Sequence, residues 1–167
     1  MKRKYIFIST ALLISLFIYL FYRTDRTLVN EIVVRMISFD TYAKLKAYIV
    51  DTLPLNDVIV FSLPEGLWVF CITLTSKPYY IGLGNRRIDC VYIPLLFCLT
   101  LEIFQLLHIT NGRFDFMDIG VFVVFWILGN CILSNRAEKQ NILAQPNLKT
   151  VVCLASYCIV YLAHVFK

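Results

Sequence analysis

Long apolar runs, separated by short polar segments, dominate the hydrophobic pattern of this chain. A helix rises about 1.5 Å per residue, so roughly 17–25 apolar residues are needed to cross about 30 Å of hydrocarbon. Four runs approach that length, and a fifth is interrupted by Pro64, Glu65 and Gly66. The pattern therefore predicts five membrane-spanning helices, at residues 5–22, 58–76, 88–108, 116–133 and 150–166.

The interrupted run at residues 58–76 predicts a helix that starts late. Proline suits the first turn of a helix, where its missing N–H is not needed, and a serine side chain can cap that turn. We therefore expect the regular helix to begin near Pro64, with Ser62 as its cap. Residues 58–63 would then enter the membrane ahead of the helix.

Residues 24–57 are too polar to span a membrane, yet apolar residues recur in this segment at steps of three and four. These positions are Val29, Ile32, Val33, Met36, Phe39, Ala43, Ala47 and Val50. The spacing predicts one or two amphipathic helices that lie on the outer membrane surface or cap the bundle. The alternative is a plain connecting segment whose apolar face packs on the spans. Together the elements predict a single all-α integral membrane domain over residues 1–167.

The composition supports a membrane protein. Of the 167 residues, 59% are hydrophobic and only 16% are charged, and the mean hydropathy is +0.72. Soluble chains are closer to half apolar and a quarter charged. A soluble enzyme, a nucleic-acid-binding protein and a secreted disulfide scaffold are therefore excluded, and nucleic acid is not an expected partner.

The net charge of +5 indicates orientation, because the basic residues lie between the hydrophobic runs. Lys and Arg in short loops prefer the cytoplasm. Placing the basic segments 2–4, 77–87 and 136–149 inside predicts a cytoplasmic N-terminus and an extracytoplasmic C-terminus. The first apolar run is too long for a cleaved signal peptide and no small-residue cleavage site follows it, so we expect it to stay as an anchor.

Ionisable residues occur at three places within or beside the predicted spans. Such residues are costly at membrane depth and usually face the interior of a bundle. Under the predicted orientation, all three places meet on the extracytoplasmic side. The candidate binding residues are Glu65, Glu102, Gln105, Arg113, Asp115 and Asp118.

The spacing of these residues suggests partners for them. Steps of three place Glu102 and Gln105 on one helix face, which His108 continues. The turn at Asn111-Gly112 would carry Arg113 back toward Glu102, and a guanidinium can hold a carboxylate through two hydrogen bonds. Asp115 and Asp118 could both face the same pocket. Alternatively, Asp115 caps the next helix and Asp118 lies in its favourable first turn.

Fully ionised, these four acids and one arginine leave three negative charges at the site. Protons, water or a cationic ligand group must offset that excess. Three interpretations remain open: pairs such as Glu102–Arg113 and Asp118–Gln105 that only join helices, a binding site, or a catalytic site. No GxSxG, HExxH, Walker or CxxC motif occurs, and the six cysteines fit apolar packing positions, so we expect no cofactor and no metal.

The segment Glu102-Ile-Phe-Gln105, followed by Gly112-Arg113-Phe114-Asp115-Phe116-Met117-Asp118 and an apolar helix with Gly129, resembles the VanZ-like family of small bacterial membrane proteins. The resembling part covers roughly residues 57–130. The resemblance implies a polytopic envelope protein of a family whose founding members are associated with resistance to the glycopeptide teicoplanin and that has no agreed biochemical activity. It also implies that the polar residues of the family correspond to Glu102, Gln105, Arg113, Asp115 and Asp118.

The expected function is therefore that of a non-catalytic envelope protein. It would bind or shield a lipid-linked cell-wall component or a glycopeptide-like amphiphile, with membrane lipids as its other partners. A location in the bacterial cytoplasmic membrane follows from the resemblance alone. The alternative is a membrane-embedded enzyme or proton-coupled carrier in which Glu102 exchanges protons with a group that Arg113 positions.

Overall fold

The chain is mostly helical, as predicted, with one small sheet near one end. The computed structural model describes residues 2–23, 28–83, 86–109, 114–132, 139–144, 150–155 and 157. Within those ranges the elements are α1 (Lys2–Phe21), α2 (Leu28–Ile37), α3 (Phe39–Thr52), α4 (Asp57–Ser76), β1 (Tyr79–Leu83), β2 (Arg86–Asp89), the 3-10 helix η1 (Cys90–Tyr92), α5 (Ile93–Leu106), α6 (Phe116–Ile132) and β3 (Gln140–Asn141).

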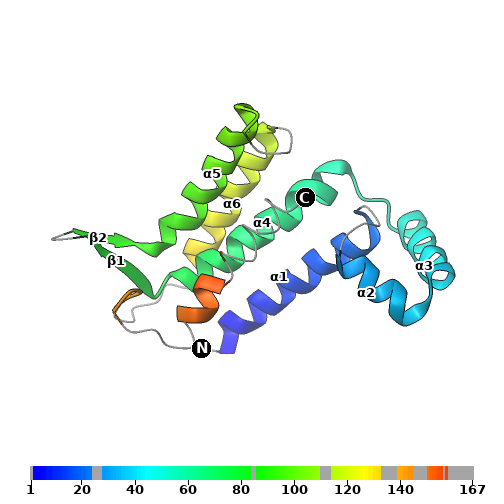
Figure 1. The fold of residues 1–167 in the computed structure, drawn as a ribbon, viewed down its shortest axis with the longest axis horizontal. Helices are drawn as coiled ribbons and strands as arrows, with labels where there is room; N and C mark the ends of the chain where they lie inside the picture. Colours follow the sequence, from blue (N-terminus) through cyan, green and yellow to red (C-terminus); the bar gives the residue numbers. More distant parts are fainter. Residues whose placement is uncertain are drawn as a thin grey trace.

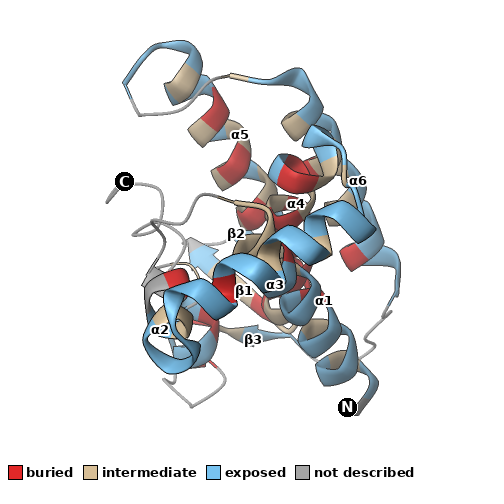
Figure 2. Ribbon diagram, turned by 90° about the vertical axis from the view of Figure 1, so that its right-hand side faces the viewer, coloured by how far each residue is buried: buried red, intermediate tan, exposed pale blue. Residues whose placement is uncertain are grey.

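Helix α4 is the centre of the structure. It packs against α1 on one side and against α5 and α6 on the other (Figure 1). Twelve of its residues are buried, and Figure 2 shows buried positions on α4 and on parts of α5 and α6. The side-chain oxygen of Asn56 caps its first turn, accepting a hydrogen bond from the backbone N–H of Ile59 at 2.9 Å.

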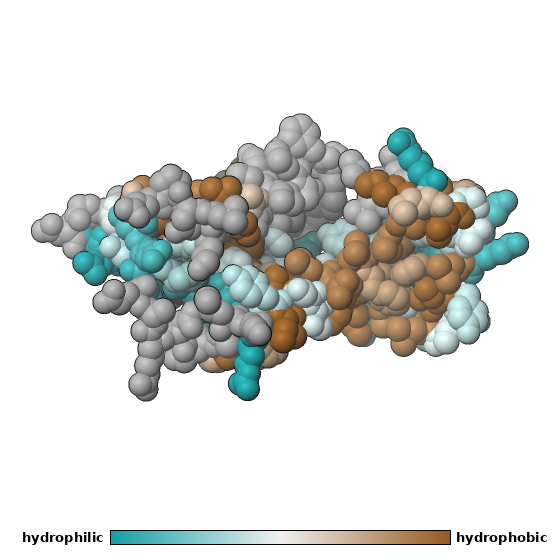
Figure 3. Space-filling model, turned by 90° about the horizontal axis from the view of Figure 1, so that it is seen from below, coloured by the Kyte–Doolittle hydropathy of each residue, from teal (hydrophilic) through white to brown (hydrophobic). Residues whose placement is uncertain are grey.

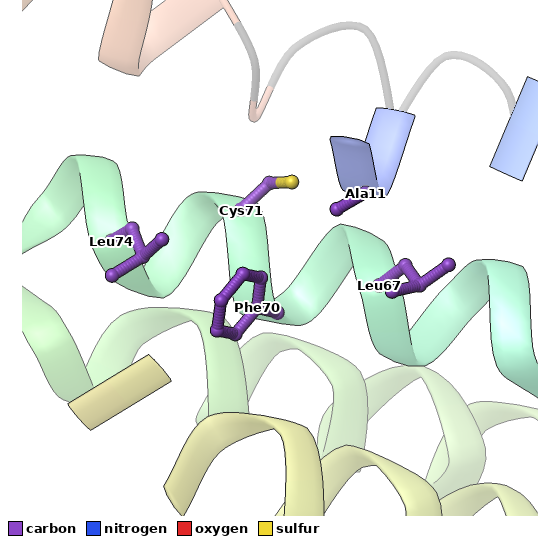
Figure 4. Packing of buried hydrophobic residues seen from close by; sticks show 5 residues of the cluster. All are labelled: Ala11, Leu67, Phe70, Cys71 and Leu74. Carbon is purple, nitrogen blue, oxygen red and sulfur yellow. The ribbon is translucent and has the colours of Figure 1, made fainter. Parts of the chain in front are cut away.

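Apolar contacts join α4 to α1. Ala11 of α1 is only 4% exposed, and it packs with a cluster of α4 residues. Figure 4 shows Ala11 facing α4 on the side of Leu67 and Cys71. A small residue at this position lets the two helices approach closely, which is the usual way that helices pack in membranes.

Two glycines set the spacing between α4 and α6. A Cβ atom added at Gly66 would lie 2.5 Å from side-chain atoms of both Phe125 and Val121. At the other end of the same contact, a Cβ atom on Gly129 would lie 3.0 Å from Thr73. Each helix therefore contributes a glycine where the other contributes a side chain, and the two backbones approach closely along their length.

The predicted amphipathic segment forms two helices, α2 and α3, and α3 caps the C-terminal end of α1. The Tyr42 hydroxyl donates to the carbonyl of Leu20, and Lys46 Nζ donates to the carbonyl of Arg23 at 3.1 Å. The last carbonyls of a helix have no partner within it and favour nearby cations. These bonds account for α3 lying across the end of α1, while apolar side chains such as Met36 and Tyr48 stay exposed.

The three-stranded sheet, in the order β2-β1-β3, was not predicted. It also corrects the span predicted at residues 88–108. That span assigns α-helix to residues that belong to strand β2 and to the 3-10 helix η1. The α-helix begins only at Ile93, with Pro94 in its first turn. The reason is pairing: residues 86–89 bond to β1 in antiparallel register, with Ile81 opposite Ile88. Strand β3 then adds to β1 in parallel.

Two described helices are long and apolar enough to cross a membrane, and they cover Arg3–Phe21 and Asp57–Ser76. The apolar stretches Cys90–Leu106 and Phe116–Ile132 are shorter than that test requires. Residues 150–155, at the start of the fifth predicted span, are helical. The remainder of that span lies outside the described residues apart from residue 157.

Substitution of Gly66 tests the close approach of α4 and α6. Gly66→Ala should lower the free energy of unfolding by about 1–3 kcal/mol, because the new methyl group overlaps the branched Val121 and the Phe125 ring. Gly120→Ala is the matched control, because Gly120 of α6 has open space around it. The measurement is the midpoint of unfolding of the purified chain in detergent. Equal midpoints for the two variants would contradict the packing described here.

Candidate functional site

The site begins at a proline inside α4. The helix runs from Asp57 through Pro64, so the prediction that it starts near Pro64 with Ser62 as cap is wrong. Pro64 has no N–H, and the carbonyl of Val60, four residues earlier, therefore loses its usual helical donor. Arg23, just beyond the end of α1, supplies one instead: its Nε donates to the Val60 carbonyl at 3.3 Å. The helix continues because a neighbouring segment satisfies the freed carbonyl.

The guanidinium of Arg23 makes further contacts around this point. Its Nη2 donates to the carbonyl of Phe61 at 2.6 Å and lies 3.6 Å from Glu65 Oε1. Its Nη1 donates to the Tyr19 hydroxyl at 3.1 Å, and its Cζ atom lies 4.5 Å from the centre of the Tyr19 ring. Only a planar group with several donors can make these contacts together, so lysine would not replace Arg23.

Glu65 lies on the wall of a cavity of about 190 Å³. The cavity is bounded by α1, α4, α5 and α6. Its lining residues are Ser15, Tyr19, Pro64, Glu65, Trp68, Cys98, Leu101, Glu102, Gln105 and Phe122. Helices α1 and α5 lie on different sides of α4 (Figure 1), and residues of both helices line the cavity. Acids predicted from two separate spans therefore share one chamber.

Glu102 is the most buried acid of this chamber, at 3% exposure. Its Oε2 accepts a hydrogen bond from the backbone N–H of Asp115 at 3.3 Å, which joins α5 to the start of α6. The carboxylates of Asp118, Glu65 and Asp115 are all close enough to interact with Glu102 electrostatically. Among the described residues, no lysine or arginine forms an ion pair with Glu102.

Asp115 and Asp118 have different environments. The Oδ1 atom of Asp115 accepts a hydrogen bond from the backbone N–H of Met117 at 2.9 Å, and Asp118 lies in the first turn of α6. Of the two alternatives from the sequence, Asp115 as a cap with Asp118 in the first turn is confirmed. The Oδ1 atom of Asp118 is buried and has no hydrogen-bond partner in the described part of the chain. The bond from Gln105 that would join two helices there is therefore not made to this oxygen.

The structure thus brings together most of the predicted site residues. Glu65, Glu102 and Gln105 line the cavity, while Asp115 and Asp118 lie beside Glu102. Arg113 lies outside the described residues, so the structure does not test the predicted Glu102–Arg113 pair. His108 has a positive φ of 56° beyond the end of α5, is exposed, and does not line the cavity.

Sequence reasoning missed Arg23, which is the described cation nearest to these acids. It also missed the aromatic walls, Trp68 and Phe122. Helical spacing could have found some of the lining, because Trp68 follows Glu65 by three residues and Cys98 precedes Glu102 by four. A signal for Arg23 existed as well: a proline and an acid inside one span require a donor and a cation at the same level of a neighbouring span.

Comparisons of the chain with family models, with curated proteins and with solved structures found no match. The chemistry of the site therefore has to be argued from its own residues. No group of three or more His, Cys, Asp or Glu side chains within the described ranges could hold a metal ion. The described cysteines, among which Cys71, Cys90, Cys98 and Cys153 are buried, are all free thiols. The lining of the chamber combines two acids, Glu65 and Glu102, with the aromatic side chains of Trp68 and Phe122.

A double-mutant cycle tests the role of Arg23 at the helix break. Arg23→Gln leaves the Val60 carbonyl without a donor and should lower the free energy of unfolding by about 1–3 kcal/mol. Pro64→Ala restores an N–H within α4, so the same Arg23 substitution should be less destabilising in that background. We expect a coupling of at least about 1 kcal/mol, measured by unfolding all four chains in the same detergent. Strict additivity of the two substitutions would contradict the assigned role.

Proposed function

We propose that this chain is a polytopic membrane protein of the VanZ-like kind. Its cavity would bind a small polar group on the head of an amphiphile such as a lipid-linked cell-wall component or a glycopeptide. The observation that carries the proposal is a chamber lined by two acids within helices whose outer surfaces are apolar. The proposed role is binding or shielding, without catalysis, and a contribution to teicoplanin resistance follows if the ligand is that glycopeptide.

The outer surfaces favour a lipid environment. Helix α1 is apolar enough to span a membrane, yet only 11% of its apolar window is buried. Leu13, for example, is 65% exposed. Figure 3 shows hydrophobic residues gathered over much of one face of the molecule, with hydrophilic residues toward its two ends. Water-exposed apolar surface on this scale is unusual for a soluble monomer. We therefore retain five spans as part of the proposal, with η1–α5, α6 and residues 150–166 completing the set.

The ends of the bundle differ in charge in a way that favours a cytoplasmic N-terminus. The start of α1, the sheet and the end of α6 lie toward one end of the bundle, and the end of α5 and the start of α6 lie toward the other (Figure 1). The described basic residues of the first end are Arg3, Lys4, Lys77, Arg86, Arg87 and Lys139. An excess of Lys and Arg in short loops is typical of the cytoplasmic side. The chamber and its acids would then face the extracytoplasmic side of the bacterial cytoplasmic membrane.

Cysteine labelling tests this orientation. In a cysteine-free chain, Asp51→Cys and Asp115→Cys should react with a membrane-impermeant maleimide added to intact cells. Arg87→Cys should react only after the cells are permeabilised. All three positions are exposed, so accessibility to the reagent depends on the compartment and not on packing. Labelling of positions 87 and 115 from the same side would reject the proposed topology.

Amphiphile binding is tested with the purified chain in nanodiscs. Teicoplanin should bind and change the tryptophan emission of a Trp126→Phe chain, in which Trp68 is the remaining tryptophan. A glycopeptide without an acyl chain should bind at least about tenfold more weakly, because burial of each methylene contributes about 0.8 kcal/mol. The measurements are tryptophan fluorescence and calorimetry.

The variant Glu102→Gln separates binding from acid–base chemistry in the same assay. A binding protein should retain weakened affinity, since glutamine keeps the shape and one acceptor of the glutamate. A proton-coupled carrier or an enzyme that uses Glu102 should instead lose nearly all turnover. Complete loss of transport or conversion of the amphiphile, with binding intact, would favour that alternative over the proposal.

A further inference from the structure

The cavity between α1 and α5 has two kinds of wall. Trp68 of α4 and Phe122 of α6 present aromatic rings to it, and Pro64 and Leu101 add further apolar surface. Glu65 and Glu102 present carboxylates, and Ser15 and Gln105 add neutral polar groups. Its volume of about 190 Å³ is similar to the roughly 150 Å³ of an engineered protein cavity that binds benzene. The chamber therefore has room for a small organic group.

The two carboxylates differ in charge compensation. Glu65 lies 3.6 Å from the guanidinium of Arg23. Glu102 is 97% buried, since its exposure is 3%, and its described hydrogen bonding consists of one backbone N–H bound to Oε2. In the described part of the chain, Glu102 Oε1 has no hydrogen-bond donor, and the buried Asp118 Oδ1 nearby has none either. A buried carboxylate without a counter-charge is unfavourable unless a proton, water or a positively charged ligand group offsets its charge. A cationic ligand is the one of these three that would give the cavity a binding function.

The walls select the kind of cation. Protein sites for divalent metal ions are usually built from several His, Cys, Asp or Glu side chains, and no group of three or more that could hold a metal ion occurs among the described residues. Aromatic faces instead attract organic ammonium groups, whose charge is spread over carbon substituents. A carboxylate beside two aromatic rings combines charge neutralisation with this attraction.

Building on the proposed function, we propose that the cavity binds an organic ammonium group, with its charge on Glu102 and its carbon substituents against Trp68 and Phe122. The ammonium group belongs to a free amine or to the headgroup of an amphiphile. Arg23 holds Glu65 at the cavity wall, so Glu102 carries the main charge contact. The amphiphile-binding protein would thereby distinguish cationic from neutral headgroups.

The test compares choline with 3,3-dimethyl-1-butanol, in which a carbon atom replaces the charged nitrogen. The full chain is placed in phosphatidylglycerol nanodiscs and titrated by calorimetry, and the emission of Trp68 in a Trp126→Phe chain reports from the cavity. Choline should bind at least about tenfold more tightly than its neutral isostere, because its charge is attracted to the carboxylate and to the aromatic faces.

Variants assign the effect to the cavity. Glu102→Gln should remove most of the preference for choline, whereas Asp51→Asn, at an exposed acid outside the cavity lining, should leave it unchanged. If Glu102→Gln fails to fold, Phe122→Leu provides a second test, with choline affinity reduced by about threefold or more through loss of one ring face. Unchanged choline affinity in a folded Glu102→Gln variant would overturn the assignment.

The source of the ammonium group is resolved by changing the lipid. In phosphatidylcholine nanodiscs, a lipid headgroup that enters the cavity competes with choline and lowers its apparent affinity. If the site takes free amines only, the affinity for choline is the same in both lipids. Equal affinity for choline and the neutral isostere would overturn the ammonium assignment while leaving teicoplanin binding, and so the proposed function, intact. Absence of binding by choline, the isostere and teicoplanin alike would overturn both.

Discussion

The contact between Arg23 and the turn of α4 that contains Pro64 is the interaction on which the rest of the structure depends. Proline removes a donor from the middle of the most buried helix, and an unsatisfied carbonyl there would destabilise it. Arg23 satisfies the Val60 carbonyl, bonds the neighbouring Phe61 carbonyl and pairs with Glu65. One side chain thus fixes the end of α1 against α4, keeps α4 helical, and holds an acid at the cavity wall.

The cavity results from the way in which the other helices pack against α4. Gly66 allows α6 to approach α4 closely, and Ala11 does the same for α1 on another face. Helix α5 is tied to the start of α6 through Glu102 and the backbone of Asp115. Helices α1 and α5 thereby border the same space from different sides of α4. The chamber is a consequence of close packing at small residues, which positions the larger Trp68 and Phe122 as its walls.

This arrangement connects stability to the proposed function. The groups that close the helices on one another, Arg23 and the first turn of α6, lie beside the groups proposed to bind ligand. Glu102 stays buried with little compensation in the described structure, whereas Glu65 has Arg23 close by. The proposed recognition of one positive charge rests on this difference between the two acids of the described structure.

The sequence by itself determined the helical class, the apolar helices, the amphipathic pair α2–α3 and most acids of the site, because periodicity and charge placement are local properties of the chain. Tertiary structure decided the rest. A proline at position 64 predicts a helix start when only local donors are considered, but a distant arginine supplies the missing donor. Likewise, residues 86–89 are apolar enough at Ile88 to extend a predicted span, yet pairing with β1 makes them a strand. Contacts between residues far apart in sequence decided both points, and hydrophobic periodicity carries no information about such contacts.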